Sequence, residues 1–170
     1  TTDTDDDDDG ILDASDTTPQ GLSSDDADGD GVSDTDEDAG LNGGDIDEDG
    51  TPDRQQAYVA SVVSVTNGAQ TGVITTGCTV ISGLESIAES SLSVQDASYT
   101  YALGLTDLVL DCVIPGSTAT ITLIYESSTS ASSIVVRKFQ DSAYSNITAT
   151  VTNGTLGGTN VVRVVYSVTD

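Results

Sequence analysis

The acidic residues of this chain are concentrated in its first third, and this uneven charge limits what that segment can fold into. Residues 1–53 hold 21 of the 29 Asp and Glu residues and no Lys or Arg, whereas the remainder has eight acids and four bases. Apolar side chains in the acidic segment are too few to offset the conformational entropy lost on ordering it, and its like charges repel one another. We therefore expect residues 1–56 to form an arm that stays extended until a cation neutralises it. A segment of this charge is not expected to bind nucleic acid.

An internal repeat indicates which cation that is. The pattern Asp-x-Asp-x-Asp-Gly-x-x-Asp occurs three times, with Gly10, Gly31 and Gly50 in the same place. Alternating aspartates offer several carboxylates from a short stretch of backbone, the glycine permits a sharp turn, and the seventh position offers a backbone carbonyl. Calcium, which binds six to eight oxygen atoms, fits this arrangement best.

Counting from the first aspartate of each copy identifies the predicted calcium ligands. The twelfth position is Asp16, Glu37 or Gln56, so that only the second copy matches the full loop pattern ending in Glu. We expect the third loop to bind more weakly, or to borrow a ligand from a neighbouring loop. The predicted ligands are Asp5, Asp7, Asp9, Ile11, Asp13 and Asp16 in the first loop, Asp26, Asp28, Asp30, Val32, Asp34 and Glu37 in the second, and Asp45, Asp47, Asp49, Thr51 and Asp53 in the third.

Other interpretations of the acidic repeats are weaker. A solvated acidic spacer would not need a glycine in register three times. Magnesium requires near-ideal octahedral geometry and retains its water, and zinc prefers His and Cys ligands, whereas the chain has no His. The segments between the repeats show no helical periodicity, so we expect no helices between the loops.

Residues 3–53 resemble thrombospondin type 3 repeats and related bacterial calcium repeats, which share the Asp-x-Asp-x-Asp-Gly pattern without the flanking helices of an EF-hand. The chain lacks the interleaved cysteines of that family. Residues 58–168 resemble the choice-of-anchor U domain of secreted bacterial proteins, notably in Tyr101-Ala-Leu-Gly-Leu-Thr-Asp-Leu-Val-Leu and Ile114-Pro-Gly-Ser-Thr-Ala-Thr-Ile-Thr-Leu. This second resemblance implies a surface-associated β module without enzymatic activity.

Residues 57–170 are rich in Val, Ile, Thr, Ser and Gly, a composition typical of β-strands. Asn67-Gly68, Pro115-Gly116 and Asn153-Gly154 are predicted turns, and Leu84, Ile87, Ala88 and Leu92 are assigned to a loop. We expect an all-β fold, a two-sheet antiparallel sandwich preceded by the irregular calcium-loop arm. The predicted strands are residues 58–65, 73–81, 99–103, 107–113, 119–125, 134–139, 147–152 and 161–168. In the last of these we expect one face to hold Val162, Val164, Tyr166 and Val168 and the other to hold Val161, Arg163, Val165 and Ser167.

Cys78 and Cys112 are the only cysteines. In an oxidising compartment they would form a disulfide that closes a loop of about 34 residues, and the alternative is two buried thiols in separate strands.

The remaining residues favour a secreted protein that is not an enzyme. No stretch approaches the roughly 20 apolar residues needed to cross a bilayer, and the chain begins without Met, which suggests a removed signal peptide. With no His, the chain lacks the commonest proton carrier, and Asp96 is expected to be solvated. Arg137 and Lys138 form a small basic spot that could pair with a calcium loop of another subunit.

Two functions follow from this pattern. The first is a structural protein in which calcium stiffens the arm that joins one β domain to the next, as the repeating subunit of an extracellular fibre or stalk. The alternative is a cell-surface module that binds a glycan or a protein and uses the calcium repeats as a spacer.

Overall fold

The computed structural model describes residues 26–78, 80–112 and 114–169. In this part of the chain the regular elements are nine strands, one α-helix and four short 3₁₀ helices. The helices are α1 (Asp34–Asp38), η1 (Leu41–Gly43), η2 (Asp53–Gln55), η3 (Glu89–Ser91) and η4 (Ala131–Ser133). The strands are β1 (Val59–Val63), β2 (Gln70–Thr76), β3 (Val80–Ile87), β4 (Leu105–Asp111), β5 (Thr118–Glu126), β6 (Arg137–Gln140), β7 (Ala143–Asn146), β8 (Thr150–Leu156) and β9 (Thr159–Thr169).

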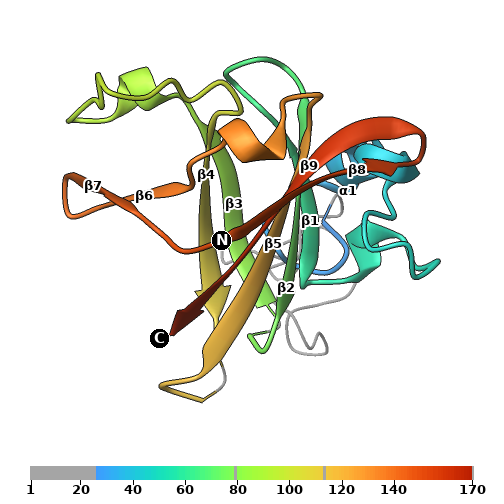
Figure 1. The fold of residues 1–170 in the computed structure, drawn as a ribbon. Coiled ribbons are helices and arrows are strands. Elements are labelled where there is room, and N and C mark those ends of the chain that lie inside the picture. The colour runs from blue at the N-terminus through green and yellow to red at the C-terminus, as the bar shows by residue number, and fades with distance from the viewer. Residues whose placement is uncertain (1–25, 79, 113, 170) are drawn as a thin grey trace, which may run out of the picture.

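The fold is an antiparallel β-sandwich, as the composition predicted. The larger sheet has the strand order β1-β2-β5-β9-β8, and a two-stranded sheet of β3 and β4 packs across it. A separate hairpin of β6 and β7 projects from the side of the sandwich opposite α1 (Figure 1). Strands β1–β2, β3–β4, β6–β7 and β8–β9 pair with their neighbours along the chain, whereas β2–β5 and β5–β9 join strands that are distant in the sequence.

Strand β9 shows how alternating side chains build the two faces of the larger sheet. Val162 and Val164 are buried in the core between the two sheets, and Tyr166 packs against that core. Val161, one residue out of phase, is buried on the opposite face. This alternation is the one that the sequence predicted for residues 161–168.

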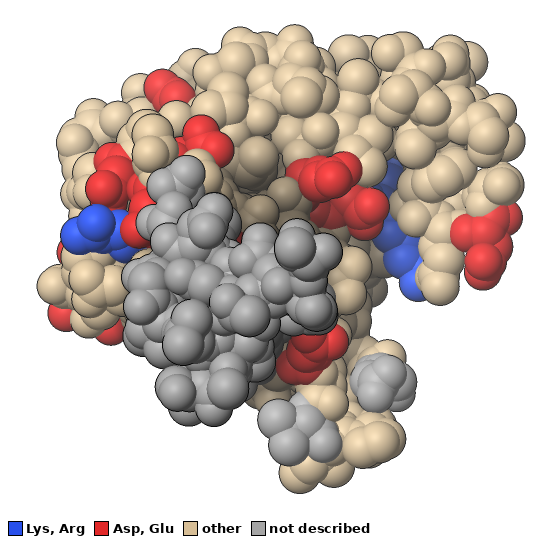
Figure 2. All heavy atoms as spheres, turned by 180° about the vertical axis from the view of Figure 1, so that it is seen from behind, with Lys and Arg blue, Asp and Glu red and all other residues tan. Residues whose placement is uncertain are grey.

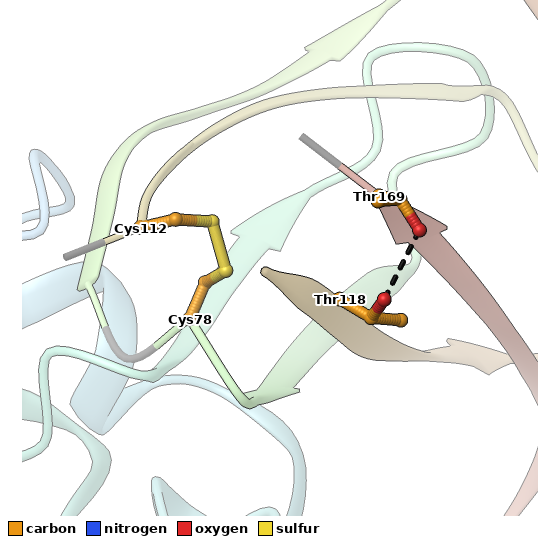
Figure 3. Close-up of a disulfide and its surroundings, with 4 residues drawn as sticks. All are labelled: Cys78, Cys112, Thr118 and Thr169. Carbon is orange, nitrogen blue, oxygen red and sulfur yellow. Dashed lines mark hydrogen bonds between the residues drawn. A yellow bond between two sulfur atoms is a disulfide. The ribbon is translucent and has the colours of Figure 1, made fainter. Parts of the chain in front are cut away.

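The two cysteines form the disulfide, which was one of the two alternatives for them. Cys78 lies between β2 and β3, and Cys112 follows β4, with their Cα atoms 4.6 Å apart (Figure 3). The bond therefore ties the start of β3 to the end of β4, at one end of the pair, beside the Thr118–Thr169 hydrogen bond between β5 and β9.

The predicted strand over residues 73–81 is wrong in its extent, because the chain leaves one sheet and enters the other within it. Gly77 has φ +95°, and a Cβ atom there would lie 2.4 Å from the carbonyl oxygen of Thr118. The close approach of β5 therefore ends β2, and β3 begins three residues later at Val80.

Leu84 and Ile87 belong to β3 rather than to the predicted loop, because their partners in β4 lie far along the chain and short-range patterns do not reveal them. Ala88 and Leu92 are outside the strands, on either side of η3.

Three further expectations for the C-terminal half are also wrong. Residues 99–103 are not a strand, because Tyr99 and Tyr101 turn towards the β6–β7 hairpin. The predicted strand over 147–152 is only partly formed, because β7 ends at Asn146 and β8 begins at Thr150. Asn153 and Gly154 lie inside β8, paired with β9, and the reversal occurs at Gly157-Gly158, which both have positive φ.

The described part of the arm packs against the larger sheet. Leu41 and Ile46 are buried with Val59 and Ile124 on the sheet face that points away from β3 and β4. Val32 packs in the core on the other face of the sheet. Helix α1 contacts β1, which is the edge strand of this sheet. The arm therefore wraps around the β1 edge and covers apolar area on both sides of it.

The side chain of Ile46 in the arm packs directly on the backbone of β2 at Gly72. A Cβ atom at Gly72 would lie 2.7 Å from Cδ1 of Ile46, so the absence of a side chain in β2 creates the space that Ile46 fills. The side-chain amide of Gln70 in the same strand donates to the carbonyl of Ala39 at 3.1 Å.

Candidate metal centre

In both acidic loops that the structure describes, the alternating aspartates converge. Asp26, Asp28 and Asp30 place one carboxylate oxygen each within 4.8 Å of one another, and Asp45, Asp47 and Asp49 do the same. Each cluster could therefore hold a metal ion. The first predicted loop, with Asp5, Asp7, Asp9, Ile11, Asp13 and Asp16, lies outside the described residues.

The two loops are built by the same hydrogen bonds, which shows that the sequence repeat is also a structural repeat. In each loop a backbone N–H near the start donates to the ninth-position carboxylate, and later N–H groups donate to the carboxylates at positions three and five. The bonds are Ala27 N–H to Asp34, Asp30 N–H to Asp28 and Val32 N–H to Asp30 in one loop, and Ile46 N–H to Asp53, Asp49 N–H to Asp47 and Thr51 N–H to Asp49 in the other.

The glycine at position six of each described loop has a left-handed backbone conformation. Gly31 and Gly50 have φ of +89° and +85°, which L side chains rarely adopt. Position four is also left-handed, with φ +79° at Gly29 and +61° at Glu48. Two left-handed residues in one turn curl the backbone so that the carboxylates on either side of them face inward.

Glu37, the twelfth position of the second loop, is delivered by a helix that the sequence analysis did not expect. The side chain of Ser33 accepts a hydrogen bond from Asp36 N–H at 3.2 Å, and the first turn contains Asp34, Asp36 and Glu37. This N-cap and the acidic first turn stabilise α1. This helix begins within the second loop, at position nine, and its single turn is too short to show periodicity in the sequence.

Three carboxylates near the loops are completely buried: Asp30, Glu37 and Asp53. Oδ2 of Asp30, Oδ2 of Asp53 and both oxygens of Glu37 have no hydrogen-bond partner among the described residues, and neither has Oδ2 of Asp28. A buried carboxylate without a partner is costly, and proteins normally pair it with a cation or a metal.

Burial and mutual repulsion raise the pKa values of these groups. Burial raises the pKa of Glu37 to about 9 and that of Asp30 to about 7, and in both cases the neighbouring carboxylates add to the effect. Burial likewise raises the pKa of Asp53 to about 6, although the hydrogen bond from Ile46 opposes the shift. A divalent cation would reverse this balance, because it stabilises the ionised form of every carboxylate that it contacts.

Gln56, the twelfth position of the third loop, is buried and faces its own loop. Its side-chain amide donates to the carbonyl of Thr51 at 3.0 Å, while its amide oxygen accepts a hydrogen bond from the hydroxyl of Tyr58. The third loop therefore has a neutral amide where the second has Glu37, and Asp49 is exposed where Asp30 is buried. This contrast favours the prediction that the third loop binds more weakly.

The sequence pattern did not reveal the role of the apolar residues of the arm. It predicts Val32 as a carbonyl ligand and too few apolar residues for a core, yet the side chains of Val32, Leu41 and Ile46 are buried against the sandwich. Their signal was available, because each is an isolated apolar residue in or beside an Asp-rich loop.

A second polar cluster joins the β6–β7 hairpin to the segment between β3 and β4. Arg137 forms an ion pair with Asp96 at 3.0 Å, lies over the ring of Tyr99 at 4.3 Å, and donates to Asn146 at 2.8 Å. Asp96 is thus largely buried rather than solvated, and Arg137 is engaged within its own chain rather than free for a calcium loop. Near this cluster lies an open cleft of about 440 Å³, whose lining includes Tyr101.

Seen from behind the view of Figure 1, the surface shows more acidic than basic side chains (Figure 2). No helix in the described part of the chain is long and apolar enough to cross a membrane. No protein-family model, curated protein or solved structure matches the chain, so the two family resemblances drawn from its sequence stay predictions.

Proposed function

We propose that the acidic loops bind calcium and that the bound ions hold the arm against the β-sandwich. The observation that carries this proposal is the set of buried carboxylate oxygens without hydrogen-bond partners, inside loops of repeated geometry. Without a cation, burying Asp30 and Glu37 together opposes folding of the arm. With one, the same groups become ligands whose binding energy stabilises the folded arm.

Calcium is the divalent ion that these residues favour. Every side chain in the two clusters is a carboxylate, and such hard ligands suit calcium or magnesium rather than zinc. A loop that curls through two left-handed residues offers many oxygens at irregular angles, which calcium tolerates and octahedral magnesium does not.

The protein that results is a secreted, non-catalytic structural protein, and we propose that it is the repeating subunit of an extracellular fibre or stalk. The disulfide supports an oxidising compartment. Among the described residues β4 pairs with β3 alone and β8 with β9 alone, so each has a strand edge that could accept a segment of another copy. A contact between two different surfaces of identical copies repeats without closing, which builds a fibre.

Calorimetric titration of the full chain with calcium tests ion binding, and magnesium at the same concentration is the matched control. We expect saturable calcium uptake at micromolar to millimolar concentrations and much weaker uptake of magnesium. A chain that takes up no calcium at millimolar concentration would contradict the proposal.

Electron microscopy of the purified protein tests the assembly, once with calcium and once with a chelator. The fibre proposal expects head-to-tail polymers that shorten or dissociate when calcium is removed. Monodisperse particles under both conditions would refute assembly while leaving calcium binding intact.

A glycan-binding module is the second candidate, and the cleft beside Tyr99 and Tyr101 is the observation in its favour. The lining also includes Glu89 and Thr66, so that aromatic faces and hydrogen-bonding groups occur together, as a sugar requires. A glycan array probed with monomers decides it: saturable binding that Tyr99→Ala abolishes would favour this function over the structural one.

A further inference from the structure

The unpartnered carboxylate oxygens do not belong to one loop. Asp28, Asp30 and Glu37 come from the second loop, whereas Asp53 is the ninth position of the third loop. Together these four residues present five oxygen atoms that solvent does not reach and that accept no hydrogen bond within the described chain. Five is close to the six to eight oxygens that a calcium ion requires.

Two acids of the second loop already have other partners. Both carboxylate oxygens of Asp26 accept backbone hydrogen bonds, one from Gly29 at 2.9 Å and one from Gly31 at 3.1 Å. Oδ1 of Asp34 accepts from Ala27 N–H at 2.8 Å. Asp34 is also only partly buried, so it is not among the orphaned groups.

The backbone brings Asp53 to the second loop. Helix η2, which begins at Asp53, contacts α1, which carries Glu37, and the next residue Arg54 pairs with Asp38 of α1 at 3.4 Å. The N–H of Asp53 donates to the carbonyl of Gly44 at 2.8 Å, and Gly44 lies directly against the backbone of Glu37.

The charges support the same placement. Repulsion from Asp53 contributes to the raised pKa values of both Asp30 and Glu37, so the three carboxylates lie close enough to interact. The backbone amide of Gln56, three residues beyond Asp53, is close enough to Asp28 to oppose the rise in the pKa of that carboxylate. The end of the third loop therefore faces the second loop at two points.

We propose that Asp53 is a ligand of the calcium ion in the second loop, which it completes together with Asp28, Asp30 and Glu37. The inference rests on the proposed calcium binding and assigns one ligand across the two repeats. Oδ1 of Asp53 holds Ile46 N–H within the third loop at 3.0 Å, while Oδ2 is the free atom. One carboxylate thus connects the ion of one loop to the backbone of the other.

Coupling between the loops follows from this arrangement. Filling the second loop would fix Asp53, and Asp53 would fix Ile46, whose side chain docks the arm on β2. The second loop would then control how firmly the third loop is held on the sandwich.

The test uses the full chain carrying Asp45→Asn and Asp47→Asn, which removes two carboxylates of the third loop's own cluster. Calcium binding is followed by calorimetry, and the binding step that Glu37→Gln weakens identifies the ion of the second loop. Asp53→Asn is then added to this background, with Glu48→Gln as the matched control. Both substitutions remove one charge of the third loop, but Glu48 is exposed and occupies no ligand position.

We expect Asp53→Asn to weaken the second-loop step at least about tenfold, because a charged ligand is lost, and Glu48→Gln to weaken it far less. Equal affinity with and without Asp53→Asn would overturn the inference. A wild-type chain that binds no calcium would instead remove the proposed function itself, so the two failures are distinguishable.

Hydrogen exchange provides a second measurement that leaves Asp53 unchanged. In the same background, filling the second loop should slow exchange of the Ile46 amide, because its acceptor becomes fixed. An Ile46 amide that exchanges at the same rate with and without calcium would also overturn the inference.

Discussion

Replacing Glu37 with glutamine should stabilise the calcium-free protein while removing much of the stability that calcium supplies. Glu37 is fully buried and neither of its oxygens has a hydrogen-bond partner among the described residues. Glutamine has nearly the same shape as glutamate and carries no charge. The substitution therefore removes the electrostatic cost of burying Glu37 while leaving the packing of its side chain nearly unchanged.

The size of the effect follows from the pKa of Glu37, which burial raises from 4.5 to about 9. At pH 7 the folded, calcium-free protein retains a proton that the unfolded chain releases, and this difference costs about 3 kcal/mol, at about 1.4 kcal/mol per pH unit above 4.5. Glutamine avoids that cost. A gain of this size corresponds to a rise of roughly 6–12 °C in the melting temperature of a domain of about 150 residues.

The assay is thermal unfolding followed by circular dichroism, in chelator and in millimolar calcium. Glu48→Gln is the control, because Glu48 is exposed, lies in the third loop and occupies no ligand position. In chelator Glu37→Gln should melt above the wild type and Glu48→Gln close to it. Calcium should raise the melting temperature of the wild type much more than that of Glu37→Gln.

The dependence on pH has a definite sign. Between pH 4.5 and pH 9 the folded calcium-free protein binds more protons than the unfolded chain, so its stability should fall as pH rises through this window. Asp30, with a pKa of about 7, acts in the same direction. Glu37→Gln should flatten this dependence. A variant that melts below the wild type in chelator at pH 7, or gains as much from calcium, would refute the reasoning.

Three further variants test contacts in different parts of the fold. Ile46→Ala should lower the free energy of unfolding by about 2–4 kcal/mol and weaken calcium binding, because it empties the contact between the third loop and β2; denaturant titration and calorimetry measure the two effects. Replacing Cys78 and Cys112 together with alanine should cost about 3–4 kcal/mol, the chain-entropy value for a separation of 34 residues, as measured by chemical denaturation in the absence of reductant. Arg137→Ala should increase hydrogen exchange in the β6–β7 hairpin by roughly tenfold, because the buried ion pair with its charge-assisted hydrogen bonds is lost, whereas Lys138→Ala, at an exposed neighbour, should leave exchange unchanged.

Local signals predicted several features correctly. Alternation of apolar residues predicted the two faces of β9, and Asn67-Gly68 and Pro115-Gly116 lie at turns, with positive φ at both glycines. Such features depend on residues close together in the chain, where side-chain period and backbone preference act directly. The convergence of Asp26, Asp28 and Asp30 is of the same kind, because one tight turn places all three.

Features that depend on distant residues were not predictable in the same way. The strand break at Gly77 is caused by the backbone at Thr118, and the strand pairing of Leu84 and Ile87 depends on β4. The segment around Tyr99 resembles a strand by composition, but its ring stacks on Arg137 of the hairpin instead. No window of neighbouring residues contains these partners.

The acidic arm shows the same division most clearly. By itself, the sequence determined that the arm forms loops that converge carboxylates, because the spacing of Asp and Gly specifies a local turn. Only the tertiary structure decided that Ile46 fills the space over Gly72 and that the charge of Asp53 acts on Glu37 of the preceding loop. The physical reason is that a turn is specified by its own backbone, whereas burial and charge repulsion depend on whichever surface the folded chain places opposite.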